Sequence, residues 1–72
     1  MTQEEKLSLI EETLDVEAGS LSADTILANV NEYDSMTKLS LIVMFDDECG
    51  KKLTGEMLRT FKTIGDIMNA MD

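Results

Sequence analysis

Ser35, with Asp34 immediately before it, is the pair of side chains whose types and position could support chemistry. The serine falls at the first turn of a strongly apolar segment and follows a long polar stretch, so we expect its hydroxyl to be exposed. Backbone N–H groups at such a helix end are unpaired, and the helix dipole would stabilise a phosphodiester attached there. Asp-Ser is also a common capping pair, and in an arbitrary sequence that structural role is the more frequent one.

The chain lacks the residues that would make Ser35 a catalytic nucleophile. It has 72 residues, no histidine and a single cysteine, Cys49. Without histidine no imidazole can activate the serine, and one cysteine permits neither an internal disulfide nor a cysteine metal site. A domain of this length buries only about 60% of its unfolded surface, which argues against a deep active site. The sequence therefore predicts that the protein is not an enzyme and has no catalytic or metal-binding residues.

Acidic residues dominate the charge: 15 Asp and Glu oppose 6 Lys and Arg, for a net charge of −9. Such a chain repels phosphate backbones, so we expect no nucleic acid partner. No apolar run approaches the roughly 18 residues that could cross a membrane, and the first residues lack the features of a signal peptide. We expect a cytoplasmic monomer without membrane insertion, built as a single domain over residues 1–72.

Two elements precede the serine, an amphipathic helix and a long loop. Thr2 and Glu5 form a capping box that starts the helix, and the pair Glu11-Glu12 is interpreted as part of its polar side. The loop spans residues 15–34 and is unusually long for a compact domain, which suggests a function. Four apolar residues are expected to pin it to the core. They are Leu21, Ile26, Leu27 and Val30.

The strongest helical signal runs from Ser35 to Cys49, where apolar residues cover more than one face. Asp34 is placed as its N-cap, and Gly50 as the glycine beyond its C-terminus. Cys49 is expected to be a buried small apolar residue. The acids at positions 46–48 lack the spacing of a calcium loop and are interpreted as a solvated face. The expected core residues of this helix are Leu41, Ile42 and Phe45.

The remaining segments predict an all-α fold. Residues 54–60 predict a short helical turn, and Thr63 with Asp66 repeats the capping-box pattern at the start of a final helix. The apolar residues of that helix are Ile64, Ile67, Met68 and Met71. We expect a small antiparallel bundle of three main helices and one short helix, with a long first loop.

One row of apolar residues leads away from the serine and is called the apolar stripe below: Met36, Leu39 and Val43. Their spacing of three and then four residues places them on one helix face. Such a row is either part of the core or a surface for a partner, and the spacing leaves both open. The flexible side chains of Met36 and Met44 would suit a surface that adapts to different partners or loads.

Taken together, these features resemble the acyl carrier protein family over nearly the whole chain. The family begins its second helix with Asp-Ser-Leu and continues with apolar positions and an acidic run. Here Asp34-Ser35-Met36 leads into the apolar helix, followed by the acids at 46–48 and Gly50. Residues 63–66, Thr-Ile-Gly-Asp, match the family's turn into its last helix. The tripeptide is weak evidence alone, but its combination with length, acidity and helix order is specific.

The resemblance implies that Ser35 carries a covalent phosphopantetheine, attached by a phosphopantetheinyl transferase from coenzyme A. Acyl groups would ride on its thiol as thioesters between acyl-loading and acyl-transferring enzymes. It also implies partner-binding roles for Asp34, which would lie beside the metal and phosphates during the transfer, and for Met36, Leu39 and Val43. Acidic residues around that patch would steer basic partner surfaces.

The sequence departs from the fatty-acid-synthesis branch of that family close to the serine. Thr37 and Ser40 stand where that branch usually has acids, Lys38 adds a base between them, and Tyr33 replaces a small or aliphatic residue. We interpret this as a carrier in a specialised lipid or secondary-metabolite pathway. Two alternatives remain open. One is an aminoacyl or peptidyl carrier, because Asp-Ser-Met also resembles D-alanyl carriers; the other is an unmodified acidic helical adaptor.

Overall fold

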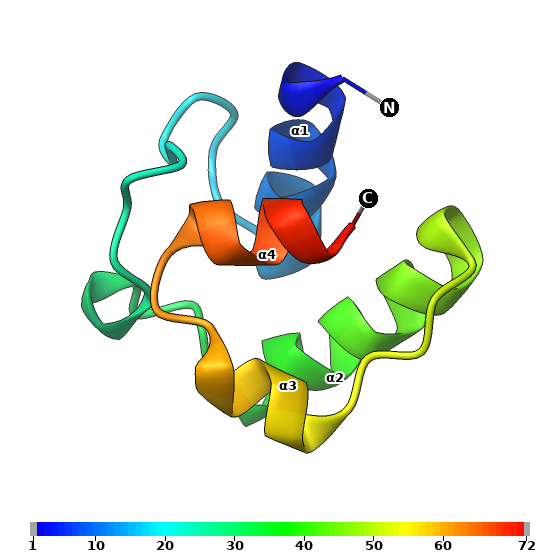
Figure 1. Cartoon of the computed structure of the whole chain (residues 1–72). Helices are drawn as coiled ribbons and strands as arrows, with labels where there is room; N and C mark the ends of the chain where they lie inside the picture. The colour runs from blue at the N-terminus through cyan, green and yellow to red at the C-terminus, as the bar shows by residue number, and fades with distance from the viewer. Residues whose placement is uncertain (1, 72) are drawn as a thin grey trace.

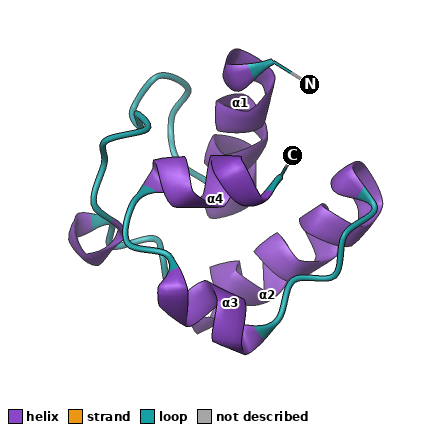
Figure 2. Cartoon of the chain, in the orientation of Figure 1, coloured by secondary structure: helices purple, strands orange, loops and turns teal. Residues whose placement is uncertain are grey.

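The computed structural model describes residues 2–71 and contains helices joined by loops, with no strand in that part of the chain (Figures 1 and 2). The all-α prediction is therefore confirmed. The α-helices are α1 (Gln3–Leu14), α2 (Ser35–Met44), α3 (Gly55–Thr60) and α4 (Ile64–Ala70). A short 3₁₀ turn, η1 (Leu27–Asn29), interrupts the long first loop, and a π-helical turn, η2 (Phe45–Cys49), extends α2.

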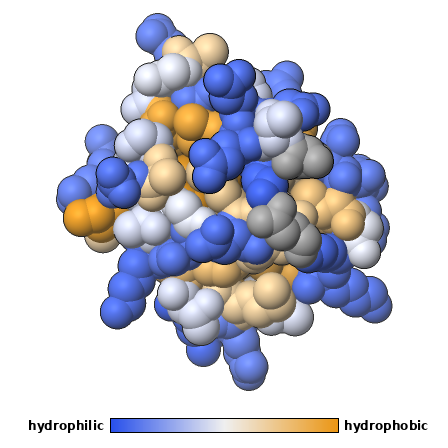
Figure 3. Space-filling view, turned by 45° about the horizontal axis from the view of Figure 1, so that its top comes forward, coloured by the Kyte–Doolittle hydropathy of each residue, from blue (hydrophilic) through white to orange (hydrophobic). Residues whose placement is uncertain are grey.

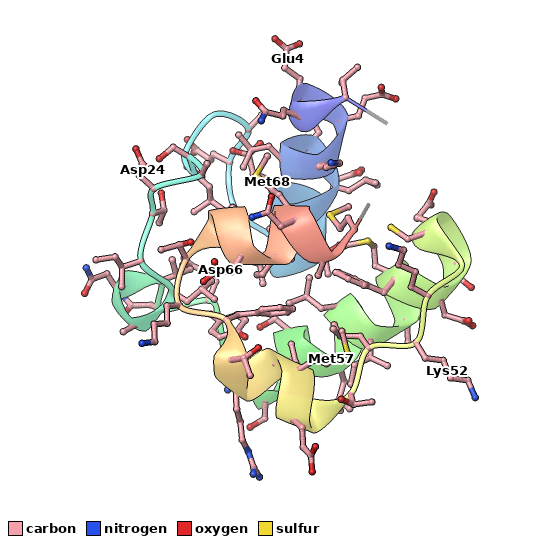
Figure 4. The ribbon with its side chains drawn as sticks, in the orientation of Figure 1. Glu4, Asp24, Lys52, Met57, Asp66 and Met68 are labelled. Atoms are coloured by element: carbon pink, nitrogen blue, oxygen red, sulfur yellow. The ribbon has the colours of Figure 1, made fainter. Side chains whose placement is uncertain are left out.

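Side-chain caps begin the helices where the sequence predicts them. Thr2 Oγ1 accepts a hydrogen bond from Glu5 N at 3.1 Å, and Glu5 Oε1 in turn accepts one from Thr2 N at 3.1 Å. The same reciprocal pair starts α4, where Thr63 Oγ1 accepts from Asp66 N at 3.2 Å. Asp66 lies at the start of α4 in Figure 4. Both capping boxes are confirmed, because each satisfies backbone donors that the first turn leaves unpaired.

The predicted helix from Ser35 to Cys49 is helical throughout, but its last turn is wider than an α-turn. Gly50 ends it in the left-handed region at φ 63°, as expected of a glycine at this position. The acidic residues at positions 46–48 are exposed, as predicted. Cys49 is partly buried and packs against the core, so the prediction of a buried cysteine is met only in part. It is the last residue of the π-turn.

The core lies where α1, α4 and the α2–η2 segment meet. Six side chains there are almost wholly buried: Phe45, Ile10, Leu14, Leu41, Ile64 and Ile67. Figure 1 shows α4 lying across α1 rather than alongside it, so the packing is less regular than an antiparallel bundle. No helix among residues 2–71 is long and apolar enough to cross a membrane.

A buried carboxylate holds the start of the long loop against α1. Glu11 Oε2 accepts hydrogen bonds from Gly19 N at 2.9 Å and from Leu21 N at 3.1 Å. The Glu11 side chain is only 5% exposed, whereas Glu12 beside it is exposed. The interpretation of the Glu11-Glu12 pair as a polar helix face is therefore wrong for Glu11. The helix turns this residue towards the loop, whose backbone N–H groups replace water as its partners.

Backbone pairing fastens the second part of the loop to the turn before α4. Ile26 and Thr63 form an isolated antiparallel bridge, in which Leu27 N donates to Lys62 O at 2.9 Å and Ile64 N donates to Thr25 O at 2.9 Å. Of the four predicted anchors, Leu21 and Leu27 are buried and Val30 packs against the core. Ile26 is half exposed, and the backbone of its neighbours Thr25 and Leu27 makes the attachment in place of its side chain.

Gly65 permits the closest of these approaches, and we predict that Gly65→Ala destabilises the protein. Gly65 N donates to Ala23 O at 2.8 Å, and a Cβ atom at Gly65 would lie 2.9 Å from that same oxygen. The backbone would have to shift, at a cost of about 1–3 kcal/mol. Urea unfolding measures the loss. Gly55→Ala is the matched control, since nothing lies within 4 Å of its Cβ position. Equal stabilities of the two variants would contradict the prediction.

Candidate functional site

Ser35 is the first residue of α2 and is exposed, as the sequence predicts. It stands at the junction between the fastened loop and the helix. Within residues 2–71 its hydroxyl makes no hydrogen bond, so no neighbouring group has to be displaced before it reacts. The site therefore presents an exposed primary hydroxyl on the first turn of α2.

Asp34 is the N-cap of α2, as predicted, and its carboxylate organises the turn around the serine. Asp34 Oδ1 accepts hydrogen bonds from Met36 N and Thr37 N, each at 3.0 Å. Two of the N–H groups that we expected to be unpaired beside Ser35 are thus already satisfied. A phosphodiester on Ser35 would still experience the positive end of the helix dipole, but those two donors belong to Asp34.

Thr37 ties the loop to this turn. Its Oγ1 accepts a hydrogen bond from Asp34 N at 2.9 Å and donates one to Glu32 O at 2.6 Å. Residues 32–37 are therefore cross-linked on both sides of Ser35. Thr37, which stands where the fatty-acid-synthesis branch usually has an acid, thus fixes the backbone at the serine. Asp34 and Thr37 form a capping box, and their spacing of three residues could have predicted it.

The hydrogen bonds to Asp34, chiefly from the Thr37 backbone, lower the pKa of its carboxyl group below that of an ordinary aspartate. A lowered folded-state pKa contributes stability above the unfolded-state pKa, and that contribution disappears as the pH falls through the folded-state pKa. We predict that Asp34→Ala is less stable than the wild type at neutral pH and that the difference vanishes in strong acid. Urea unfolding across this range measures it, with Asp47→Ala as a charge-matched control. A difference that persists in strong acid would contradict the prediction.

Tyr33 and Lys38 flank the serine on the side that faces α3. Lys38 Nζ lies 4.9 Å from the centroid of the Tyr33 ring, a cation–π contact. The Tyr33 hydroxyl is buried and has no hydrogen-bond partner among the residues that the structure describes. Burial raises the pKa of Tyr33 above its ordinary value, so the hydroxyl stays protonated and available as a donor.

The apolar stripe lies on the surface. Met36, Leu39 and Val43 are 78%, 64% and 59% exposed, so the alternative that all three belong to the core is wrong. Leu41 and Phe45 are buried as predicted, and Ile42 packs partly against the core. Met44 is also buried, so of the two methionines only Met36 is placed to meet a partner. A row of exposed apolar side chains is typical of an interaction surface.

Two further features bear on other possible sites: the polarity of one face of the molecule and the grouping of metal-ligating side chains. On the face seen in Figure 3, hydrophilic residues predominate and apolar residues show only in small areas. Among residues 2–71 no three Cys, Asp or Glu side chains come together as a potential metal site.

A hollow that the sequence does not predict lies next to this site. It has a volume of about 550 Å³ and lies between η1, the start of α2 and α3. Its lining includes Tyr33 and three basic residues, Lys38, Arg59 and Lys62. The sequence shows that basic residues are concentrated in the second half of the chain, but no local spacing brings these three to one place.

Comparison with known proteins gives no relative: no family model, no curated protein and no solved structure matches the chain.

Proposed function

We propose that this protein is an acyl carrier, which holds acyl groups as thioesters on a phosphopantetheine arm attached to Ser35. The observation that carries the proposal is the exposed Ser35 hydroxyl at the first turn of α2, on a backbone cross-linked by Asp34 and Thr37. The resemblance of residues 34–36 and 63–66 to acyl carrier proteins supplies the chemistry. The local geometry supports it, because the positive end of a helix stabilises a phosphodiester.

Attachment of the arm is a phosphoryl transfer from coenzyme A. The Ser35 oxygen bonds to the phosphorus that bears the pantetheine, the pyrophosphate P–O bond breaks, and the adenosine bisphosphate leaves with that electron pair. The serine proton passes to a base of the phosphopantetheinyl transferase. The carrier performs no catalysis itself, in keeping with the absence of histidine from its sequence. Its contribution is to bring the load to a docked enzyme at high effective concentration.

Recognition by partner enzymes is proposed to use Asp34 and the apolar stripe. The stripe runs from the residue after Ser35 along the exposed face of α2, so a partner that covers it has the arm at its edge. The partners are the transferase and the acyl-loading and acyl-transferring enzymes. α2 contains no acidic residue and one basic residue, Lys38, which favours partners of a specialised pathway over those of general fatty acid synthesis. Within this proposal the protein is a cytoplasmic monomer.

One alternative from a different class rests on the same exposed stripe. An unmodified acidic adaptor would bind its partners through Met36, Leu39 and Val43 without any arm on Ser35. An aminoacyl or peptidyl carrier would share the site and differ only in the load.

The intact mass of the protein tests the proposal. The purified chain is incubated with a broad-specificity phosphopantetheinyl transferase, magnesium and coenzyme A. We expect the mass to rise by one phosphopantetheinyl group, located by fragmentation at Ser35 and not at the other serines. No gain with an active transferase, together with a bare chain isolated from the native host, would overturn the proposal in favour of the adaptor.

A further inference from the structure

The hollow beside Ser35, called the groove below, has apolar residues at its base and basic residues around them. Leu27 of η1, Leu58 of α3 and Phe61 beyond α3 contribute apolar surface to it. Leu27 and Leu58 are buried and belong to the hydrophobic core, so the base of the groove is continuous with the core. Arg59 and Lys62 line it with exposed side chains. A hollow of this size with few polar groups on an apolar base has the usual make-up of a small-molecule site.

Its charge is opposite to that of the rest of the protein. Acidic residues outnumber basic ones by 15 to 6 in the chain, yet the lining contains three basic residues and no acidic one. The neighbouring hollow, between the end of α1 and the loop, is lined instead by Asp15, Glu17 and Glu32. A concave surface with charges of one sign focuses the field within it. This groove therefore favours an anion, whereas the acidic surface elsewhere repels one.

Tyr33 and Lys38 connect the groove to the attachment site. Tyr33 is two residues before Ser35, and Lys38 is three residues after it on α2, one turn along the same side of the helix. Both line the groove. The Lys38 ammonium group lies over the Tyr33 ring there, 4.9 Å from its centroid. A group on a flexible arm at Ser35 thus has a short route into this groove.

We propose that Arg59 and Lys62 make the groove between η1, α2 and α3 selective among carried acyl groups, in favour of those with a carboxylate at the far end, that is, dicarboxylic half-thioesters. This inference rests on the proposed carrier function. The apolar base takes the methylene chain, and Arg59 and Lys62 pair with the distal carboxylate. Lys38 and Tyr33 lie at the end nearest the arm. The apolar and charged parts of the ligand thus follow one another in the same order as the apolar and basic residues along the groove.

Nuclear magnetic resonance of the loaded protein tests the inference. The transferase is given coenzyme A, hexanoyl-coenzyme A or hexanedioyl-coenzyme A, and intact mass confirms each load on ¹⁵N-labelled protein. We expect hexanedioyl to shift the amides of Tyr33, Arg59 and Lys62 more than hexanoyl does. Exposed ion pairs of this kind should raise the ratio of groove-bound to free load by about two- to fivefold. The excess should shrink at high salt.

Two charge-matched double variants separate the groove from the general charge of the protein. Arg59→Gln combined with Lys62→Gln should reduce the hexanedioyl shifts to the hexanoyl level. Lys51→Gln combined with Lys52→Gln changes the net charge equally and should preserve the difference. Lys52 projects outward from the chain after η2 in Figure 4, and neither lysine lines the groove. If both double variants lose the difference equally, the inference is wrong.

The remaining outcomes distinguish the load from its arm and from the proposed function. If coenzyme A alone gives the full shifts, the phosphodiester occupies the groove and the inference is overturned. If hexanoyl and hexanedioyl give equal shifts on a fully loaded protein, the inference fails while the carrier function stands. If the mass shows no modification, the carrier function fails. Titration with the free N-acetylcysteamine thioesters then decides: preference for the hexanedioyl probe supports an anion-selective groove, and its absence overturns it.

Discussion

Replacement of Ser35 by alanine is expected to abolish loading completely while leaving the fold intact. The hydroxyl is the sole atom to which the arm could attach at this position, and within residues 2–71 it makes no hydrogen bond whose loss would weaken the protein. Alanine also has the highest helix propensity, so α2 should still begin at residue 35. Intact mass after incubation with the transferase and coenzyme A measures the loss, and thermal unfolding confirms the fold.

Ser40→Ala is the matched control for this experiment. Ser40 is an exposed serine of the same helix, and its hydroxyl bonds only the Met36 carbonyl one turn earlier, at 3.3 Å. It should load like the wild type. If Ser35→Ala gains an arm while remaining folded, the attachment site is wrong. If Ser35→Ala keeps every partner and function in the native host, the adaptor alternative is supported over the carrier.

Glu11→Ala is expected to destabilise the protein by about 2–4 kcal/mol, because it leaves the N–H groups of Gly19 and Leu21 without their shared acceptor. A carboxylate that accepts two backbone hydrogen bonds in a buried position cannot be replaced by water without opening the loop. For a domain of this size the loss corresponds to a fall of roughly 10–25 °C in Tm. Thermal and urea unfolding both measure it.

The adjacent residue provides the control. Glu12 has the same side chain and the same charge but is exposed, so Glu12→Ala should change stability by no more than about 0.5 kcal/mol. Glu11→Gln keeps one acceptor oxygen and should fall between the two. Equal effects of Glu11→Ala and Glu12→Ala would show that the loss of negative charge, and not the loop attachment, sets the stability.

The helix starts and the exposure of Ser35 were predictable from the sequence because they depend on neighbours within about four residues. Thr2, Asp34 and Thr63 cap the turns that directly follow them, and each does so through its own side chain and a backbone N–H two or three residues on. Exposure of Ser35 follows from the same local rule. A serine directly after an N-cap lies on the first turn, before the helix packs on the core.

Only the tertiary structure decided what the inward-facing residues contact. Glu11 shares the helix face of Leu7 and Leu14 by its spacing, but the backbone N–H groups that satisfy its carboxylate belong to a loop eight to ten residues later. The apolar stripe has a spacing that suits core and surface equally, and its exposure depends on where α1 and α4 pack against α2. The close approach of Gly65 to Ala23 joins segments about forty residues apart.

By itself the sequence determined an acidic, all-α protein with a capped, exposed Ser35 and without the side chains of a serine hydrolase. The tertiary structure added the basic groove, because Lys38, Arg59 and Lys62 are brought together only when α3 packs beside the start of α2. The physical reason is one of range. Caps and helix periodicity are set by hydrogen bonds between near neighbours, whereas burial and charge clustering are set by which distant segments share a surface.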